Sequence, residues 1–137
     1  MTVRSHLLAV TLGGALGAGL RIATVAATAM VLPKWFAIMA LNIAGSAAIG
    51  WCMHAVSPQR HTLRLFLCTG LLGAMTTFSG FADALVNQGS DHHIATAMMN
   101  ITASMCFTVL GVVVGRRCAQ LKDTRRTAKS PSADRQP

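Results

Sequence analysis

The densest group of residues with polar chemistry is Gly70–Phe81, which reads Gly-Leu-Leu-Gly-Ala-Met-Thr-Thr-Phe-Ser-Gly-Phe. It lies in the middle of an apolar stretch, residues 63–86, that is long enough to cross a bilayer. Glycine is a poor helix former, and serine and threonine hydroxyls compete for backbone hydrogen bonds. We therefore predict that residues 73–79 are non-helical, which frees backbone groups for an ion. The alternative is a face of small residues for close helix packing.

Two further apolar spans carry polar side chains. Asn42 is the single strongly polar residue of the second span, and its amide is a hydrogen-bond donor in a low-dielectric setting. Asn100 and Ser104 stand four residues apart in the last span, so they share one helical face. Such side chains either hold helices together or line a pore. The residues alone leave both interpretations open.

A charge and two aromatic rings complete the candidate set. Arg21 interrupts the first span, where a charge must reach the interface, find a partner or face a wet vestibule. Phe78 and Phe81 lie three residues apart, on one side of the chain if that segment is helical. The positive edge of an aromatic ring can favour an anion, although simple packing is the alternative.

Four short motifs, in order and one per span, resemble the Fluc fluoride-channel family, also called CrcB. They extend over residues 6–117, nearly the whole chain except its tail. The matching residues are Gly13-Gly14 through Gly17 to Arg21, Leu41-Asn42-Ile43-Ala44-Gly45, Thr76-Thr77-Phe78-Ser79-Gly80-Phe81 preceded by Gly70 and Gly73, and Ala95-Thr96 with Asn100, Ser104 and Gly111.

The resemblance implies an antiparallel, dual-topology dimer with two pores that conduct fluoride passively out of the cytoplasm. It places Phe78, Phe81 and Asn42 along the fluoride path and includes an arginine that matches Arg21, for which a place near an aqueous vestibule would suit an anion. By residue type, Thr77, Ser79, Asn100 and Ser104 are the other donors that we expect along this path. The resemblance also implies a structural sodium ion at the dimer centre, bound by backbone carbonyls of Gly73 and Thr76.

Two positions depart from the pattern of that family. Gly80 stands where serine or threonine is usual, which removes one hydroxyl from the expected polar track. Asn100 stands where many members have tyrosine, which keeps a donor but shortens its reach. Both departures affect the details of the track rather than the fold.

The composition excludes a soluble domain. Hydrophobic residues make up 53% of the 137-residue chain and charged residues 12%, against about 25% charged residues in soluble domains. The net charge is +8, but seven of the twelve lysines and arginines lie from Arg116 onward, directly after the last apolar run. This placement favours membrane lipid headgroups over nucleic acid as the partner.

We therefore predict an all-α membrane protein of four transmembrane helices in the inner (plasma) membrane. The expected spans are about 7–32, 35–56, 63–86 and 94–114, within one channel domain of residues 1–117. Gly111 and Gly115 are expected to close the last helix, and residues 118–137 to form a basic disordered tail. No motif for catalysis is visible, so an enzyme is not expected.

Two other functions compete with a channel. A small dual-topology exporter would need a membrane-embedded glutamate, and the chain contains no glutamate. A structural membrane subunit without fluoride conduction would use Asn42 and the Ser/Thr cluster to hold helices together. The charge bias places both termini in the cytoplasm, so a heterodimer with an oppositely oriented sister subunit is the alternative to a homodimer.

Overall fold

The computed structural model describes residues 3–80, 82 and 94–128, and every regular element within them is helical. Four helical stretches are long and apolar enough to cross a membrane: Val3–Thr28, Lys34–Ala55, His61–Gly80 and Ile101–Arg125. Few side chains of these stretches are buried within the single chain, as expected for helices that face lipid or a partner. The predicted all-α fold with four apolar spans is confirmed at this level.

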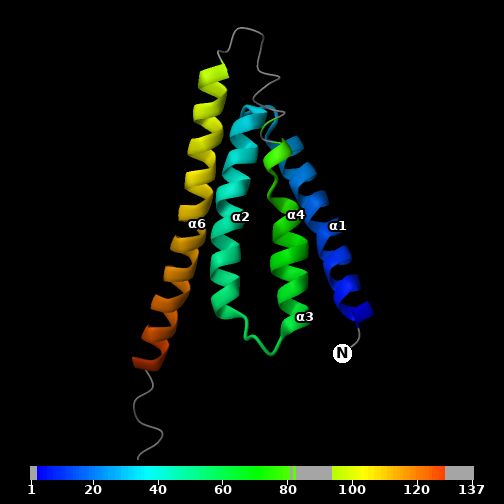
Figure 1. The fold of residues 1–137 in the computed structure, drawn as a ribbon, viewed down its shortest axis with the longest axis vertical. Coiled ribbons are helices and arrows are strands. Elements are labelled where there is room, and N and C mark those ends of the chain that lie inside the picture. Colours follow the sequence, from blue (N-terminus) through cyan, green and yellow to red (C-terminus); the bar gives the residue numbers. More distant parts are fainter. Residues whose placement is uncertain (1–2, 81, 83–93, 129–137) are drawn as a thin grey trace, which may run out of the picture.

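The helices form two closely packed pairs. Helix α2 packs along α6, and helix α1 packs along the third span. In Figure 1, α2 and the third span lie in the middle, between α1 and α6. The N-terminal end, the turn after α2 and the C-terminal end of α6 lie at one end of the molecule. The elements are α1 (Val3–Thr28), α2 (Lys34–Ala55), α3 (His61–Arg64), the π-helix η1 (Leu65–Leu72), α4 (Gly73–Met75) and α6 (Ile94–Ala128).

Glycines bring α1 and η1 into backbone contact. A Cβ at Gly13 would collide with the carbonyl oxygen of Phe66, and one at Gly17 would collide with that of Leu71. From the other side, a Cβ at Gly70 would stand 2.8 Å from the carbonyl oxygen of Val10. Small residues that admit another helix this closely are typical of membrane interfaces, where packing rather than water exclusion drives association.

A second glycine contact joins α2 to α6. A Cβ at Gly50 would collide with the backbone of Val112, and one at Gly115 would collide with the backbone of Ala47. A Cβ at Gly111 would stand 3.0 Å from the carbonyl oxygen of Ile43. The expectation that Gly111 and Gly115 close the last helix is therefore wrong: these residues lie inside α6 and allow it to approach α2.

Helix α6 also continues where we expected a disordered tail. Residues 118–128 are helical, so the predicted tail is wrong for these positions, while residues 129–137 lie outside the described part. The extension is rich in Arg, Lys, Ala, Gln and Leu, which are good helix formers. Extending an existing helix also avoids the cost of nucleation.

The third span changes helical geometry along its length. After the π-helical turns, α4 ends at Met75, Thr76 takes extended backbone angles (φ −84°, ψ 132°), and Thr77 belongs to no helix. Residues 78–80 are helical again. The prediction that all of residues 73–79 are non-helical is thus wrong for five of the seven, because glycine and serine are tolerated in helices on both sides.

We predict that Gly115→Ala destabilises the protein, because its methyl group must push the backbone of α6 away from that of α2. The apparent melting temperature in detergent, followed by circular dichroism, should fall relative to the parent. Gly19→Ala is the matched control, because nothing lies within 4 Å of a Cβ at Gly19 and alanine is the better helix former. Equal melting temperatures for the two variants would contradict the close backbone contact.

Candidate functional site at Thr76 and Thr77

Asn42 of α2 binds both backbone groups of Thr77. Its Oδ1 accepts a hydrogen bond from the Thr77 amide nitrogen at 2.8 Å, and its Nδ2 donates to the Thr77 carbonyl oxygen at 3.0 Å. The Asn42 side chain is buried, with 7% of its surface exposed. A peptide group outside a helix needs such partners at membrane depth, because lipid offers none.

This pairing changes the partner of the Gly73 carbonyl. In a continuous α-helix the N–H of Thr77 would donate to the carbonyl oxygen of Gly73. Here that N–H donates to Asn42, and the Gly73 oxygen accepts a 3.3 Å bond from the Thr76 hydroxyl, which lies 3.1 Å from the Leu72 oxygen as well. The Gly73 carbonyl has therefore lost its regular helical donor.

Thr77 also caps the helical turn that follows it. Its Oγ1 accepts a hydrogen bond from the Gly80 amide at 3.4 Å and lies 3.2 Å from the Ser79 hydroxyl. A threonine side chain bonded to the third N–H of a helix is a standard N-cap. In an uninterrupted helix that N–H would bind the Thr76 carbonyl instead. The carbonyl oxygens of Gly73 and Thr76 are the two that we expect to bind sodium. Neither of them accepts the N–H that it would accept in a continuous helix.

Four of the predicted path residues line one cavity of about 290 Å³. It lies where α2, the third span and α6 meet, and its floor includes the buried Ser104. The Phe78 side chain, 55% exposed on the single chain, forms part of its wall. The lining residues are Asn42, Thr76, Thr77, Phe78, Ser104, Met105, Thr108 and Val109.

The side chains that line this cavity are better suited to bind an anion than a cation. The Asn42 amide and the hydroxyls of Thr77 and Ser104 can donate hydrogen bonds, whereas those of Thr76 and Thr108 already bond to backbone carbonyls one turn earlier. None of the lining residues carries a carboxylate. The Asn42 amide has two N–H bonds, and only one is used by the Thr77 carbonyl. The site therefore combines donors, an aromatic ring and apolar walls without a negative charge.

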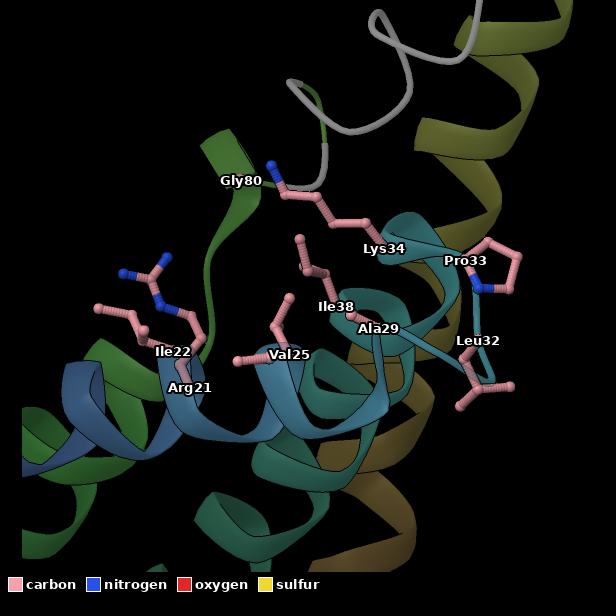
Figure 2. A pocket seen from close by; sticks show the side chains of 10 residues that line it. Arg21, Ile22, Val25, Ala29, Leu32, Pro33, Lys34, Ile38 and Gly80 are labelled. Atoms are coloured by element: carbon pink, nitrogen blue, oxygen red, sulfur yellow. The ribbon is translucent and has the colours of Figure 1, made fainter.

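Arg21 lies in a separate cavity of about 530 Å³ between the ends of α1 and α2 (Figure 2). Its Nε is buried and has no hydrogen-bond partner within the described part of the chain. The walls are mostly apolar, and Figure 2 shows Val25 and Ile38 between the Arg21 and Lys34 side chains. A Cβ at Gly80 would stand 3.6 Å from Arg21 Nη1, so the absence of a side chain there leaves the guanidinium room.

Some predicted site residues do not join this arrangement. Ser79 contacts Thr77 but is not among the residues that line either cavity. Phe81 lies outside the described residues, and so does the side chain of Asn100, although its backbone belongs to α6.

Two lining residues were not among the predicted site residues. Lys34 lines the Arg21 cavity, and no local sequence pattern places its side chain there. Thr108 lines the 290 Å³ cavity and continues the polar face of Asn100 and Ser104 at the same four-residue spacing, which is the signal that marks it. Within the described residues, no group of three or more His, Cys, Asp or Glu side chains could hold a metal ion.

Comparison with known proteins supplies the family. Residues 8–116 match the family model described as CrcB-like protein, Camphor Resistance (CrcB). The chain belongs to the CrcB-like family. The matched region contains every residue that lines the two cavities described above.

Curated relatives align with this chain over most of their own length. A protein of Chelativorans sp. (strain BNC1) is 36% identical over 118 residues, which cover 80% of this chain and 92% of the relative. One of Methylobacterium sp. (strain 4-46) is 36% identical over 116 residues, covering 78% and 90%. Both bear the name fluoride-specific ion channel FluC. No solved structure matches this chain at a significant level.

The Asn42–Thr77 pair generates a stability prediction. Asn42→Leu keeps a side chain of similar size but leaves the N–H and C=O of Thr77 without their partner. An unsatisfied buried polar group costs about 1–3 kcal/mol, so the variant should melt at a clearly lower temperature in detergent. Thr102→Val is the control, because Thr102 is exposed and its hydroxyl only bonds back to Met98 of its own helix. An Asn42→Leu variant as stable as this control would show that the pair contributes little.

Proposed function

We propose that this chain forms a passive, fluoride-selective channel in the bacterial plasma membrane, which exports fluoride from the cytoplasm and so reduces its toxicity. The family match and the FluC relatives support a channel rather than an enzyme. The observation that favours it in the structure is the convergence of Asn42, Thr77, Phe78 and Ser104 on one cavity.

Fluoride is small and holds its water tightly, so a selective path must replace that water with donors. The second N–H of Asn42 and the hydroxyls of Thr77 and Ser104 can provide them inside the 290 Å³ cavity. Phe78, and Phe81 beyond the described residues, would present ring edges to the anion. Asn100 and Ser79 would extend the donor track.

Arg21 would raise the local concentration of anions at the entrance. The apolar walls of its cavity strengthen this effect, because charge in a low-dielectric cleft focuses the electric field. The buried Nε without a protein partner supports a wet or anion-accessible cavity, since such a donor favours an acceptor.

A passive path is sufficient for export. Hydrogen fluoride crosses membranes uncharged and dissociates in a more alkaline cytoplasm, where the anion is trapped. The membrane potential favours outward movement of an anion by about 2.3 kcal/mol per charge per 100 mV. The chain therefore needs neither a nucleotide site nor a proton-carrying glutamate to drive transport.

The functional unit in this proposal is an antiparallel, dual-topology dimer. The exposure of Phe78 supports the dimer, because a second copy of the chain would cover the open side of the cavity that Phe78 lines. So do Leu8, Leu12 and Leu16, which form an exposed apolar row on α1. A homodimer is favoured over a heterodimer with an oppositely oriented sister subunit, although basic residues gather at the end of the molecule where α1 begins and α6 ends (Figure 1).

In this dimer the third span is functionally broken and its carbonyls hold a structural sodium ion. The loss of helical N–H donors at Gly73 and Thr76 fits this role, because carbonyl oxygens without their regular donors can bind a cation. The Gly73 oxygen accepts the Thr76 hydroxyl with one lone pair and has a second one left. When bound, the ion would supply a fixed positive charge to the Gly73 and Thr76 carbonyls. Asn42 keeps the Gly73 oxygen available by taking the N–H of Thr77 for itself.

Two alternatives remain as outcomes of the experiment below. An exporter that trades protons for cations lacks its acidic residue here, since the chain contains no glutamate and the cavity lining no carboxylate. A structural membrane subunit would use the same polar contacts without conducting any ion.

The principal test is fluoride efflux from liposomes that contain the purified protein. We expect the parent to release fluoride but not chloride, and Phe78→Ile to reduce the fluoride rate at least tenfold because it removes the ring edge while keeping apolar bulk. Phe107→Ile is the matched control, since Phe107 is as exposed as Phe78 but lines neither cavity.

Two results would contradict the proposal at different levels. A folded, dimeric parent that passes no fluoride would refute the channel itself and leave the structural subunit. A Phe78→Ile variant that conducts like the parent would refute only the ring-edge contribution.

A further prediction concerns the carbonyl site. Gly73 is exposed on the single chain, and a Cβ there would meet only the Cys68 oxygen, at an ordinary 3.4 Å. Gly73→Val should therefore leave the helix intact yet weaken the dimer through its bulk at the twofold axis, whereas Thr76→Ser keeps the backbone ligand and should be mild. Light scattering during size-exclusion chromatography, in sodium and in potassium buffers, measures this. A dimer fraction that changes neither with the cation nor with the Gly73→Val substitution would rule out the sodium site.

A further inference from the structure

Helix α6 is longer than a membrane requires. Its 35 residues extend about 52 Å at 1.5 Å per residue, whereas the hydrocarbon core is about 30 Å thick. Figure 1 shows the C-terminal turns of α6 continuing beyond the end of α2. Residues 117–128 also lie outside the region that matches the family model. The proposed ion path does not involve this extension.

A cavity of about 750 Å³ lies between the extension and the last turns of α2. Ala119 of α6 is buried there, with 5% of its surface exposed, and the Gly115–Ala47 contact lies one turn before it. The cavity is lined by Trp51, His54, Ala55, Ala119, Lys122, Asp123 and Arg125.

The cavity carries more positive than negative charge. Lys122 and Arg125 stand three residues apart on one face of α6, and His54 of α2 faces the same cavity. Asp123 is the single acidic residue of the lining and has an interaction of its own. Two permanent cations against one carboxylate leave the cavity attractive to an anion.

The depth of the cavity indicates what kind of anion. Trp51 stands one turn before the end of α2, where tryptophan usually marks the boundary between acyl chains and headgroups. Trp51 is 43% exposed and lines the cavity together with the cations. A soluble anion such as free phosphate would gain nothing from that ring, whereas a lipid would pack its glycerol and acyl groups on it.

We propose that this cavity binds an anionic phospholipid, with its phosphate at Lys122, Arg125 and His54 and its glycerol region against Trp51. Basic cavities between transmembrane helices are suited to such headgroups, and arginine binds phosphate through two parallel hydrogen bonds. The bound lipid links the α6 extension to the end of α2. The site is independent of fluoride conduction.

The test is the melting temperature of the full-length protein in detergent, measured with added phosphatidylglycerol and with added phosphatidylcholine. A ligand that binds only the folded state raises the melting temperature. We expect phosphatidylglycerol to raise that of the parent and phosphatidylcholine to leave it unchanged. The double variant Lys122→Gln with Arg125→Gln should lose at least half of the shift.

Arg116→Gln with Arg117→Gln is the matched control, because it removes the same charge from exposed positions of the same helix that do not line the cavity. It should retain the full shift. An equal loss in both double variants would reduce the effect to general charge attraction and overturn the site. An equal shift with phosphatidylcholine, or with inorganic phosphate at the same concentration, would overturn it too.

Native mass spectrometry provides a readout that does not depend on stability. The parent and the Arg116/Arg117 variant should retain bound phosphatidylglycerol, whereas the Lys122/Arg125 variant should lose it. Equal retention by all three proteins would contradict the proposal even if their melting temperatures differed. Because neither measurement uses fluoride, the lipid site and the channel can fail separately.

Discussion

The arrangement depends on satisfying backbone hydrogen bonds where lipid offers no substitute. The regular helical hydrogen bonds stop in the middle of the third span, after the Thr76 N–H binds Leu72. The Thr77 N–H, which no longer donates to Gly73, must then find another partner inside the protein. Asn42 supplies both partners for Thr77, one through its oxygen and one through its nitrogen. Without such a side chain on the neighbouring helix, continuous helix would be the more stable conformation.

The same hydrogen bonds position the candidate site. Since Asn42 takes the N–H of Thr77, the Gly73 carbonyl loses its regular donor, and the Thr77 hydroxyl is left to cap the next turn. The cavity with Phe78 and Ser104 lies next to this contact. One amide side chain thereby determines the shape of the backbone and contributes a donor to the cavity.

The sequence was sufficient to predict the four spans and four of the residues that line the cavity, namely Asn42, Thr77, Phe78 and Ser104. Long apolar runs leave little choice in a membrane, and a lone asparagine in such a run requires a partner. It was not sufficient to predict which partner. The width of the interruption depends on how much of it Asn42 can satisfy, which is a property of two packed helices. Likewise, the π-helical turns at Leu65–Leu72 arise against the glycines of α1.

The wrong expectations have a common physical origin. Gly111 and Gly115 looked like helix ends because glycine is a poor helix former, but contact with the α2 backbone outweighs that preference. The basic segment after them looked disordered because it carries few apolar residues, yet it continues a helix that is already nucleated. Local composition cannot report either effect, because both depend on a neighbour that is distant in sequence.

The two glycine contacts have a mechanical consequence. Backbones that touch directly cannot slide without losing many contacts at once, so α1 with η1, and α2 with α6, each behave as one stiff body. The 290 Å³ cavity lies across the junction of these two bodies, with Asn42 and Ser104 on one and Thr77 and Phe78 on the other. The width of the cavity therefore depends on how the two helix pairs are placed relative to each other. The hydrogen bonds between Asn42 and Thr77 join the two pairs and limit how far they can separate.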